Sequence, residues 1–194
     1  MVTFRILLIL LHLMCFSSAL FLVMREDIRL LMADRLQIDA LEATAAKVSR
    51  ALAGLFVTGA AIIYVDTGFV LSEILARPKL VAKISVVLIL TVNGAAMHHL
   101  IFPKLHLAPL QRPGWLCRMA CSLGALSSVS WLYATFLGIA KPLTEPLGYS
   151  GFMVLYAVLV IGAIVGAQIF VAPRAKALLF GASPNTDTVG LQTP

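Results

Sequence analysis

The sequence predicts an all-α membrane protein, folded as a bundle of five transmembrane helices. Hydrophobic residues make up 60% of its 194 residues. Charged residues make up 12%, whereas about a quarter of the residues in an average soluble domain are charged. Apolar runs of about 20 residues, the length that crosses a bilayer, recur along the chain. We therefore expect one helical bundle that uses most of the chain.

The expected spans cover residues 4–24, 51–71, 80–102, 115–139 and 149–171. Together they form a single domain over residues 1–172. The remaining residues, 173–194, end in small and polar side chains and are expected to form a flexible tail.

The first apolar run can also be interpreted as a signal peptide. Arg5 gives it a charged start, and Ser17-Ser18-Ala19 has the small side chains of a cleavage site. The run continues beyond that site to Met24, which favours a membrane helix that is retained.

Residues 25–50 form a strongly polar section between the first two spans. The section carries five basic and five acidic residues and contains no Pro or Gly. Its apolar residues recur every three or four positions, which is typical of a helix. We expect the first two helices to extend beyond the membrane here and to pack against each other. This part serves as a solvated hairpin or as a docking surface for a partner.

Prolines and glycines predict where the later helices end and where they pack. Pro78 suits the first turn of the third span, and the prolines between residues 103 and 113 predict that no helix continues after it. Gly162 and Gly166 form a small-residue motif on the fifth span, which favours packing against a membrane-protein partner or a second copy of the chain.

Basic residues predict the orientation in the membrane. Of the 15 Lys and Arg residues, ten fall on the side that holds the first loop, the third loop and the tail, and five fall on the other side. The positive-inside rule then predicts a multi-pass protein of a bacterial inner membrane, with the N-terminus outside and the C-terminus in the cytoplasm. The basic residues lie at the ends of apolar runs, so we expect contact with the lipid bilayer and not with nucleic acid.

Five polar side chains are expected to form a layer near the middle of the membrane: His12, Ser17, Asn93, Ser127 and Ser128. A rise of about 1.5 Å per residue puts His12 and Asn93 within about 6 Å of each other in depth. Because hydrocarbon offers no hydrogen bonds, we expect Asn93 to bond with His12 and the serines of the fourth span. The layer then serves helix packing or, alternatively, a substrate or proton path.

A metal site at the cytoplasmic end is a second hypothesis. His98 and His99 end the third span, His106 follows in the loop, and Cys117 and Cys121 lie one turn apart at the start of the fourth span. Imidazole and thiolate groups together suit copper or zinc. The spacing matches no known ligand motif, however, and adjacent helical residues point about 100° apart. Packed cysteines and interfacial histidines are therefore the alternative interpretation.

A haem held between two histidines is a third hypothesis. Its opposed ligands would be His12 and one of His98 and His99, because the second, fourth and fifth spans contain no histidine. These ligands differ in depth by about 14 Å, although the two ligands of one iron should lie at one level. We expect a protein without a bound cofactor, with haem or copper as the alternative.

The pattern of the first half resembles a known group of proteins. It combines a first span with His12, a polar helical loop, a second span with Gly54 and Gly59, and the stretch ARPKLVAKISVVLIL that begins the third span. Over roughly residues 5–105 this is similar to small bacterial inner-membrane proteins of the copper-resistance protein D type and their uncharacterised relatives. The resemblance implies copper handling or an undefined membrane role.

The expected spans contain no nucleophile with an adjacent base, no phosphate-binding loop and no paired carboxylates, so we do not expect an enzyme. The expected function is transport of a small solute or metal ion, or an accessory role in a membrane complex. The alternative is a haem- or copper-binding protein in electron transfer or metal handling.

Overall fold

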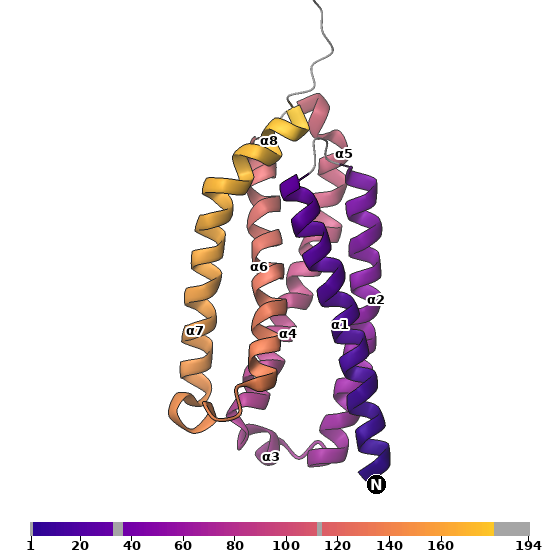
Figure 1. The fold of residues 1–194 in the computed structure, drawn as a ribbon, viewed down its shortest axis with the longest axis vertical. Helices are drawn as coiled ribbons and strands as arrows, with labels where there is room; N and C mark the ends of the chain where they lie inside the picture. The colour runs from indigo at the N-terminus through magenta and orange to yellow at the C-terminus, as the bar shows by residue number, and fades with distance from the viewer. Residues whose placement is uncertain (1, 33–36, 112–113, 181–194) are drawn as a thin grey trace, which may run out of the picture.

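A computed structural model of the chain describes residues 2–32, 37–111 and 114–180, and these residues are almost entirely helical (Figure 1). The side chains of residues 107–111, 179 and 180 are not described. Five helical stretches in these ranges are long and apolar enough to cross a membrane: Val2–Met32, Ile38–Thr67, Pro78–His106, Gly114–Ile139 and Thr144–Leu178. The predicted all-α bundle of five membrane-length helices is confirmed.

The elements follow one another as an up-and-down bundle. They are α1 (Val2–Met32), α2 (Ile38–Thr67), α3 (Leu71–Leu75), α4 (Pro78–Ala96), η1 (Met97–Ile101), α5 (Phe102–Gln111), α6 (Gly114–Ile139), α7 (Thr144–Gly166), η2 (Ala167–Val171) and α8 (Ala172–Phe180). The N-terminus and α3 lie at one end of the bundle, and α5 and α8 lie at the other (Figure 1).

Two helices continue through prolines by means of a π-helical turn. A proline lacks the backbone N–H and its ring clashes with the carbonyl four residues earlier. Each of the turns η1 and η2 ends two residues before a proline, Pro103 and Pro173. In a π-helical turn the N–H bonds to the carbonyl five residues back, as Phe102 N–H does to the carbonyl of Met97. This wider turn accommodates the ring.

The prediction that the prolines after residue 102 stop the helix is therefore wrong, because α5 includes Pro103 and Pro109. The expected flexible tail also differs from the structure. Its first part, up to Phe180, continues the fifth span as helix α8, and the rest of the tail, 181–194, lies outside the described residues.

Helices α1 and α2 form an antiparallel pair that is held together along its length. At the N-terminal end of α1, Arg5 contacts both carboxylate oxygens of Asp66 at 2.6 and 3.0 Å. Further along, His12 Nδ1 lies 2.8 Å from Thr58 Oγ1. A Cβ added at Gly54 would lie 3.0 Å from the sulfur of Cys15. A small residue at this position therefore allows the helices to approach closely.

A second packing unit consists of α4, α6 and α7. Its buried residues are Ala82, Val86, Tyr133, Leu137, Ala140, Phe152 and Tyr156. The Tyr133 hydroxyl donates a 2.6 Å hydrogen bond to the carbonyl of Phe152, and Ser130 Oγ lies 2.8 Å from the Tyr156 hydroxyl. Polar groups in this core thus pair across the helices, as they must where water is excluded. Phe16 of α1 stacks at 5.6 Å on Trp131 of α6 and joins the two units.

Most of the described part of the polar section, residues 25–32 and 38–50, is helical, as predicted. Helix α1 continues to Met32, and α2 begins at Ile38. Its position differs from the expectation, however. Asp27 contacts Ser128, which is halfway along α6, so this part of α1 lies beside the bundle and not beyond it.

Candidate functional site: a polar cavity between the helices

The structure contains a cavity of about 440 Å³ in the half of the bundle that carries α5 and α8. Its lining comes from α1, α2, the continuous stretch from α4 through η1 to α5, α6, and the continuous stretch from α7 to α8. Most of the lining residues are apolar. A Cβ added at Gly94 or Gly124, which line the cavity, would meet no atom within 4 Å. We call this space the Asp27 cavity, after the carboxyl group that distinguishes it.

Asp27 reaches the cavity from α1 and bonds to the opposite wall. Ser128 Oγ on α6 donates a 2.6 Å hydrogen bond to Asp27 Oδ2, and a second contact at 3.0 Å joins this hydroxyl to the carbonyl of Gly124. Throughout the part of the chain that the structure describes, no Lys, Arg or His side chain forms an ion pair with Asp27. Among the described residues, the carboxyl group of Asp27 thus has no positive partner.

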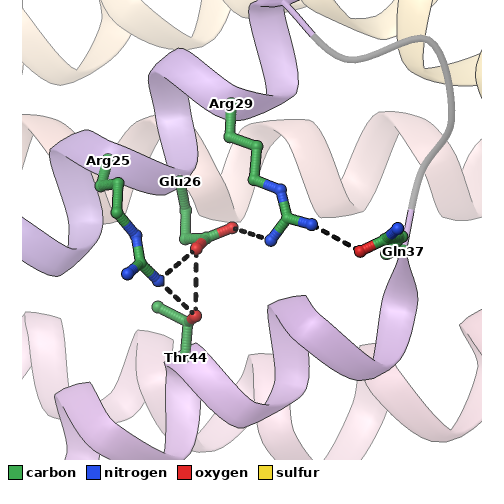
Figure 2. A network of polar contacts seen from close by, with 5 residues as sticks. All are labelled: Arg25, Glu26, Arg29, Gln37 and Thr44. Carbon is green, nitrogen blue, oxygen red and sulfur yellow. Dashed lines mark hydrogen bonds and ion pairs between the residues drawn. The ribbon is translucent and has the colours of Figure 1, made fainter.

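The neighbouring carboxylate, Glu26, has several partners. Figure 2 shows that it lies between two arginines of the same helix. Arg25 approaches Glu26 at 2.8 Å and Arg29 approaches it at 3.8 Å. Thr44 Oγ1 of α2 donates to it at 3.1 Å. Glu26 is therefore paired with two arginines, whereas Asp27 bonds to the hydroxyl group of Ser128.

Two residues of the lining, Asn93 and Trp131, each carry one buried polar atom without a hydrogen-bond partner. Asn93 Nδ2 donates a 3.0 Å hydrogen bond to the carbonyl of Leu123. The other end of this side chain, Oδ1, is buried without a hydrogen-bond partner, and so is Nε1 of Trp131. The two residues are only 4% and 1% exposed. Buried polar groups are nearly always paired, so these two atoms, which lie within the packed wall of the cavity, are exceptions.

The amide orientation of Asn93 follows from its partner. The carbonyl oxygen of Leu123 is an acceptor only, so the nitrogen of the Asn93 amide must face it. The oxygen is then the end left without a partner.

The structure brings together part of the expected polar layer. Asn93, Ser127 and Ser128 all line the Asp27 cavity. Two other members lie elsewhere, because His12 pairs with Thr58 of α2, and Ser17 bonds to the carbonyl of Leu13 in its own helix. The expectation that His12 and the serines satisfy the Asn93 amide differs from the structure, in which the amide donates to the backbone of α6.

The residues of the metal hypothesis are divided between several surroundings. His98, Cys117 and Cys121 line the cavity, whereas His106 Nε2 lies 3.1 Å from a carboxylate oxygen of Glu42. The His98 ring stacks edge-on against His99 at 6.0 Å and against Phe102 at 5.8 Å. Among the residues with described positions, no three His, Cys, Asp or Glu side chains form a group that could hold a metal ion.

The thiol of Cys117 lies 3.7 Å from the carbonyl of Ala172, and both cysteines pack against the α7–α8 stretch. The two cysteines thus have the packing role that was expected as the alternative to a metal site. Of the haem hypothesis, the structure shows only that His12 faces α2 and that His98 faces the cavity. Copper and haem binding remain predictions that these positions do not test.

Sequence reasoning missed Asp27, Trp131 and the pairing of Arg5 with Asp66. Asp27 falls in the polar helical section, residues 25–50, which the sequence predicts to be a solvated hairpin or a docking surface. A signal was present, since α1 is 31 residues long and nothing in the sequence interrupts it. Such a helix exceeds the roughly 20 residues of a span and can shift along its axis against its neighbours.

No family model matches the chain, and neither a curated protein nor a solved structure is significantly similar to it. The resemblance to the copper-resistance protein D type therefore stays a prediction.

Proposed function

We propose that this protein is a membrane carrier for small organic cations, which bind in the Asp27 cavity. The observation that supports the proposal is the carboxyl group of Asp27, which faces the cavity halfway along α6 and has no ion-pair partner among the described residues. Charged groups inside a membrane bundle are costly and mark substrate or ion pathways. A cationic solute supplies the charge that the site lacks.

The walls of the cavity favour an organic cation over a metal ion. A hard cation needs six or more oxygen ligands, and a soft one needs converging thiolates or imidazoles. The described lining is mainly apolar, and its polar side chains other than Asp27 are dispersed over several helices: Glu26, Thr44, Ser49, Asn93, His98, Cys117, Cys121, Ser127 and Ser128. Apolar walls with a few placed polar groups are typical of sites for small molecules.

The proposal includes the orientation predicted by the basic residues. The end of the bundle with α5 and α8 faces the cytoplasm of a bacterial inner membrane, and the Asp27 cavity then lies in the cytoplasmic half. A solute bound there is held between α1 and α7, which lie on either side of α6 (Figure 1).

Uptake into proteoliposomes tests the proposal. Radiolabelled ethyltrimethylammonium is a suitable probe, because its permanent charge keeps it from crossing lipid unaided. We expect protein-dependent uptake that the variant Asp27→Asn lowers at least about tenfold, since this change removes the charge from a buried pair. The matched control is Asp39→Asn, which makes the same chemical change at an exposed position at the start of α2.

Uptake equal to that of empty liposomes would reject transport. Equal uptake by the two variants would reject Asp27 as the site. If the unaltered protein binds the cation but does not move it, the protein is not a carrier, and the cavity is the binding site of an accessory subunit.

A further inference from the structure

A second pocket, of about 480 Å³, lies between the start of α6 and the stretch from η2 to α8. It is at the end of the bundle where α8 turns away from the axis of α7 toward α5 (Figure 1). Its lining includes Arg118 of α6, Gln168 of η2 and Lys176 of α8. Among the described residues it shares only Cys117 with the Asp27 cavity, so it is a separate site. We call it the Arg118 pocket.

Hydrogen bonds join the two walls of the Arg118 pocket. The side-chain nitrogen of Gln168 donates to the carbonyl of Arg118 at 2.9 Å and to Ser122 Oγ at 2.8 Å. The thiol of Cys117 donates to the carbonyl of Ala172 at 3.7 Å. These bonds tie η2 and α8 to the first turns of α6. Both N–H groups of the Gln168 amide are thereby used, and the charged group of Arg118 is left to bind a ligand.

The positive charges of the Arg118 pocket are not balanced by a carboxylate. Among the residues with described side chains, neither Arg118 nor Lys176 forms an ion pair. A third positive group is close by, because the ammonium group of Lys104 lies 5.4 Å from the ring centre of Trp115, another lining residue. The sequences of α5, α6, η2 and α8 contain no Asp or Glu. Basic groups clustered in this way attract an anion.

The position of the pocket indicates which anion reaches it. Arg118 is near the start of the fourth expected span, and Lys176 lies just beyond the end of the fifth, so both are at the level of lipid headgroups. Trp115 is 52% exposed, and tryptophans are typical of the membrane–water interface. Met119 and Phe170 are exposed apolar side chains of the same two walls, which acyl chains can cover. Basic pockets between transmembrane helices bind the headgroups of anionic lipids.

We propose that the Arg118 pocket binds the phosphate group of an anionic phospholipid, with Arg118 and Lys176 as its charged donors. The planar guanidinium group of Arg118 matches two oxygens of one phosphate, and the ammonium group of Lys176 adds a compact charge. A free phosphate ion offers the same oxygens, so the experiment includes both sources. The site does not depend on Asp27 or on transport of a cation.

Native mass spectrometry of the full chain in a neutral detergent tests the lipid source. Dioleoylphosphatidylglycerol and dioleoylphosphatidylcholine have the same acyl chains and a phosphate group, but only the first has a net negative charge. A titration with each lipid gives the dissociation constant of the first bound molecule. We expect the phosphatidylglycerol to bind about tenfold more tightly than the phosphatidylcholine, because two basic groups near the headgroup favour the anion.

Two double variants locate the preference. Arg118→Gln with Lys176→Gln removes both charges from the pocket and should reduce the ratio between the two lipids to about one. The matched control is Lys47→Gln with Arg50→Gln, which changes the net charge equally on α2, outside the pocket. It should leave the ratio unchanged. All four side chains are exposed, so we expect both double variants to fold.

Equilibrium dialysis of the same proteins with radiolabelled inorganic phosphate tests the other source. We expect no phosphate binding that depends on Arg118 and Lys176, which makes the lipid the source. Phosphate binding that is lost in the pocket variant and kept in the control would support the same site with free phosphate as the source. The proposal is overturned if the pocket variant changes neither the lipid ratio nor phosphate binding, or if the control variant changes them equally.

Discussion

Ser128 Oγ donates a hydrogen bond of 2.6 Å to Asp27 Oδ2, although the two residues lie 101 positions apart in the chain. The bond places Asp27 of α1 at the level of the middle of α6. It also holds the carboxyl group toward the cavity and away from Arg25 and Arg29, which pair with Glu26.

Replacing Ser128 by Ala should therefore destabilise the contact between α1 and α6. We expect a loss of about 1 kcal/mol, the size of a typical hydrogen bond between membrane helices. Thermal unfolding in detergent measures it. The matched control is Ser127→Ala, which removes the adjacent hydroxyl on the same helix and should cost less. Equal losses for the two variants would show that the Asp27 bond contributes nothing to stability.

Gly54 should tolerate no branched side chain. A Cβ at this position would lie 3.0 Å from the sulfur of Cys15, so Gly54→Val forces α1 and α2 apart. Overpacking of this kind costs about 1–3 kcal/mol. The control is Gly138→Val on α6, where an added Cβ meets no atom within 4 Å.

A second substitution identifies the clash as the cause. Cys15→Ala removes the sulfur atom, so the double variant Cys15→Ala, Gly54→Val should recover part of the lost thermal stability. If Gly54→Val and Gly138→Val melt at the same temperature, α1 and α2 are not as close as described.

The ion pair of Arg5 with Asp66 should be exchangeable. Asp66→Arg places two positive groups together at the N-terminal end of α1 and should lower the melting temperature in detergent. The double variant Arg5→Asp, Asp66→Arg restores opposite charges and should recover most of the loss at low salt. A double variant no more stable than Asp66→Arg would contradict this pairing of α1 with α2.

The basic residues on the first loop, the third loop and the tail predict the orientation in the membrane. Alkaline phosphatase, which is active only outside the cytoplasm, should be inactive when fused after Pro194. A fusion before Arg5 that keeps the first helix should be active. The reverse pair of results would place the Asp27 cavity in the outer half of the membrane.

The five spans could be predicted because each is an uninterrupted apolar run of membrane length. The small residues of α2 also indicated a close approach, and Gly54 permits one against Cys15. Apolar runs and small residues are properties of short stretches of the chain, so both can be recognised in the sequence itself. The neighbouring residues do not determine whether the helix continues through Pro103. Proline excludes the regular α-helical bond at that turn, but it does not tell whether the chain ends the helix or widens it into η1.

The candidate site was predictable only in part. Asn93 and Ser128 stand out as polar residues within apolar runs, and both line the cavity. Asp27 does not stand out, because its position beside Ser128 depends on the displacement of α1 along its axis. Composition and periodicity contain no information about such a displacement. The orphan groups of Asn93 and Trp131 depend on the packing of several helices and become visible only in three dimensions.

The most direct test of a cation site in the Asp27 cavity is the chemical accessibility of its wall. In the variant Ser127→Cys, an introduced thiol lines the cavity next to Ser128 and leaves Asp27 in place. Mass spectrometry then follows its reaction with two methanethiosulfonate reagents, one with a trimethylammonium group and one with a sulfonate group. We predict that the cationic reagent modifies this thiol, that the anionic reagent reacts far more slowly, and that ethyltrimethylammonium protects against the cationic reagent. Equal reaction with both reagents, without protection by ethyltrimethylammonium, would contradict a cation site at Asp27.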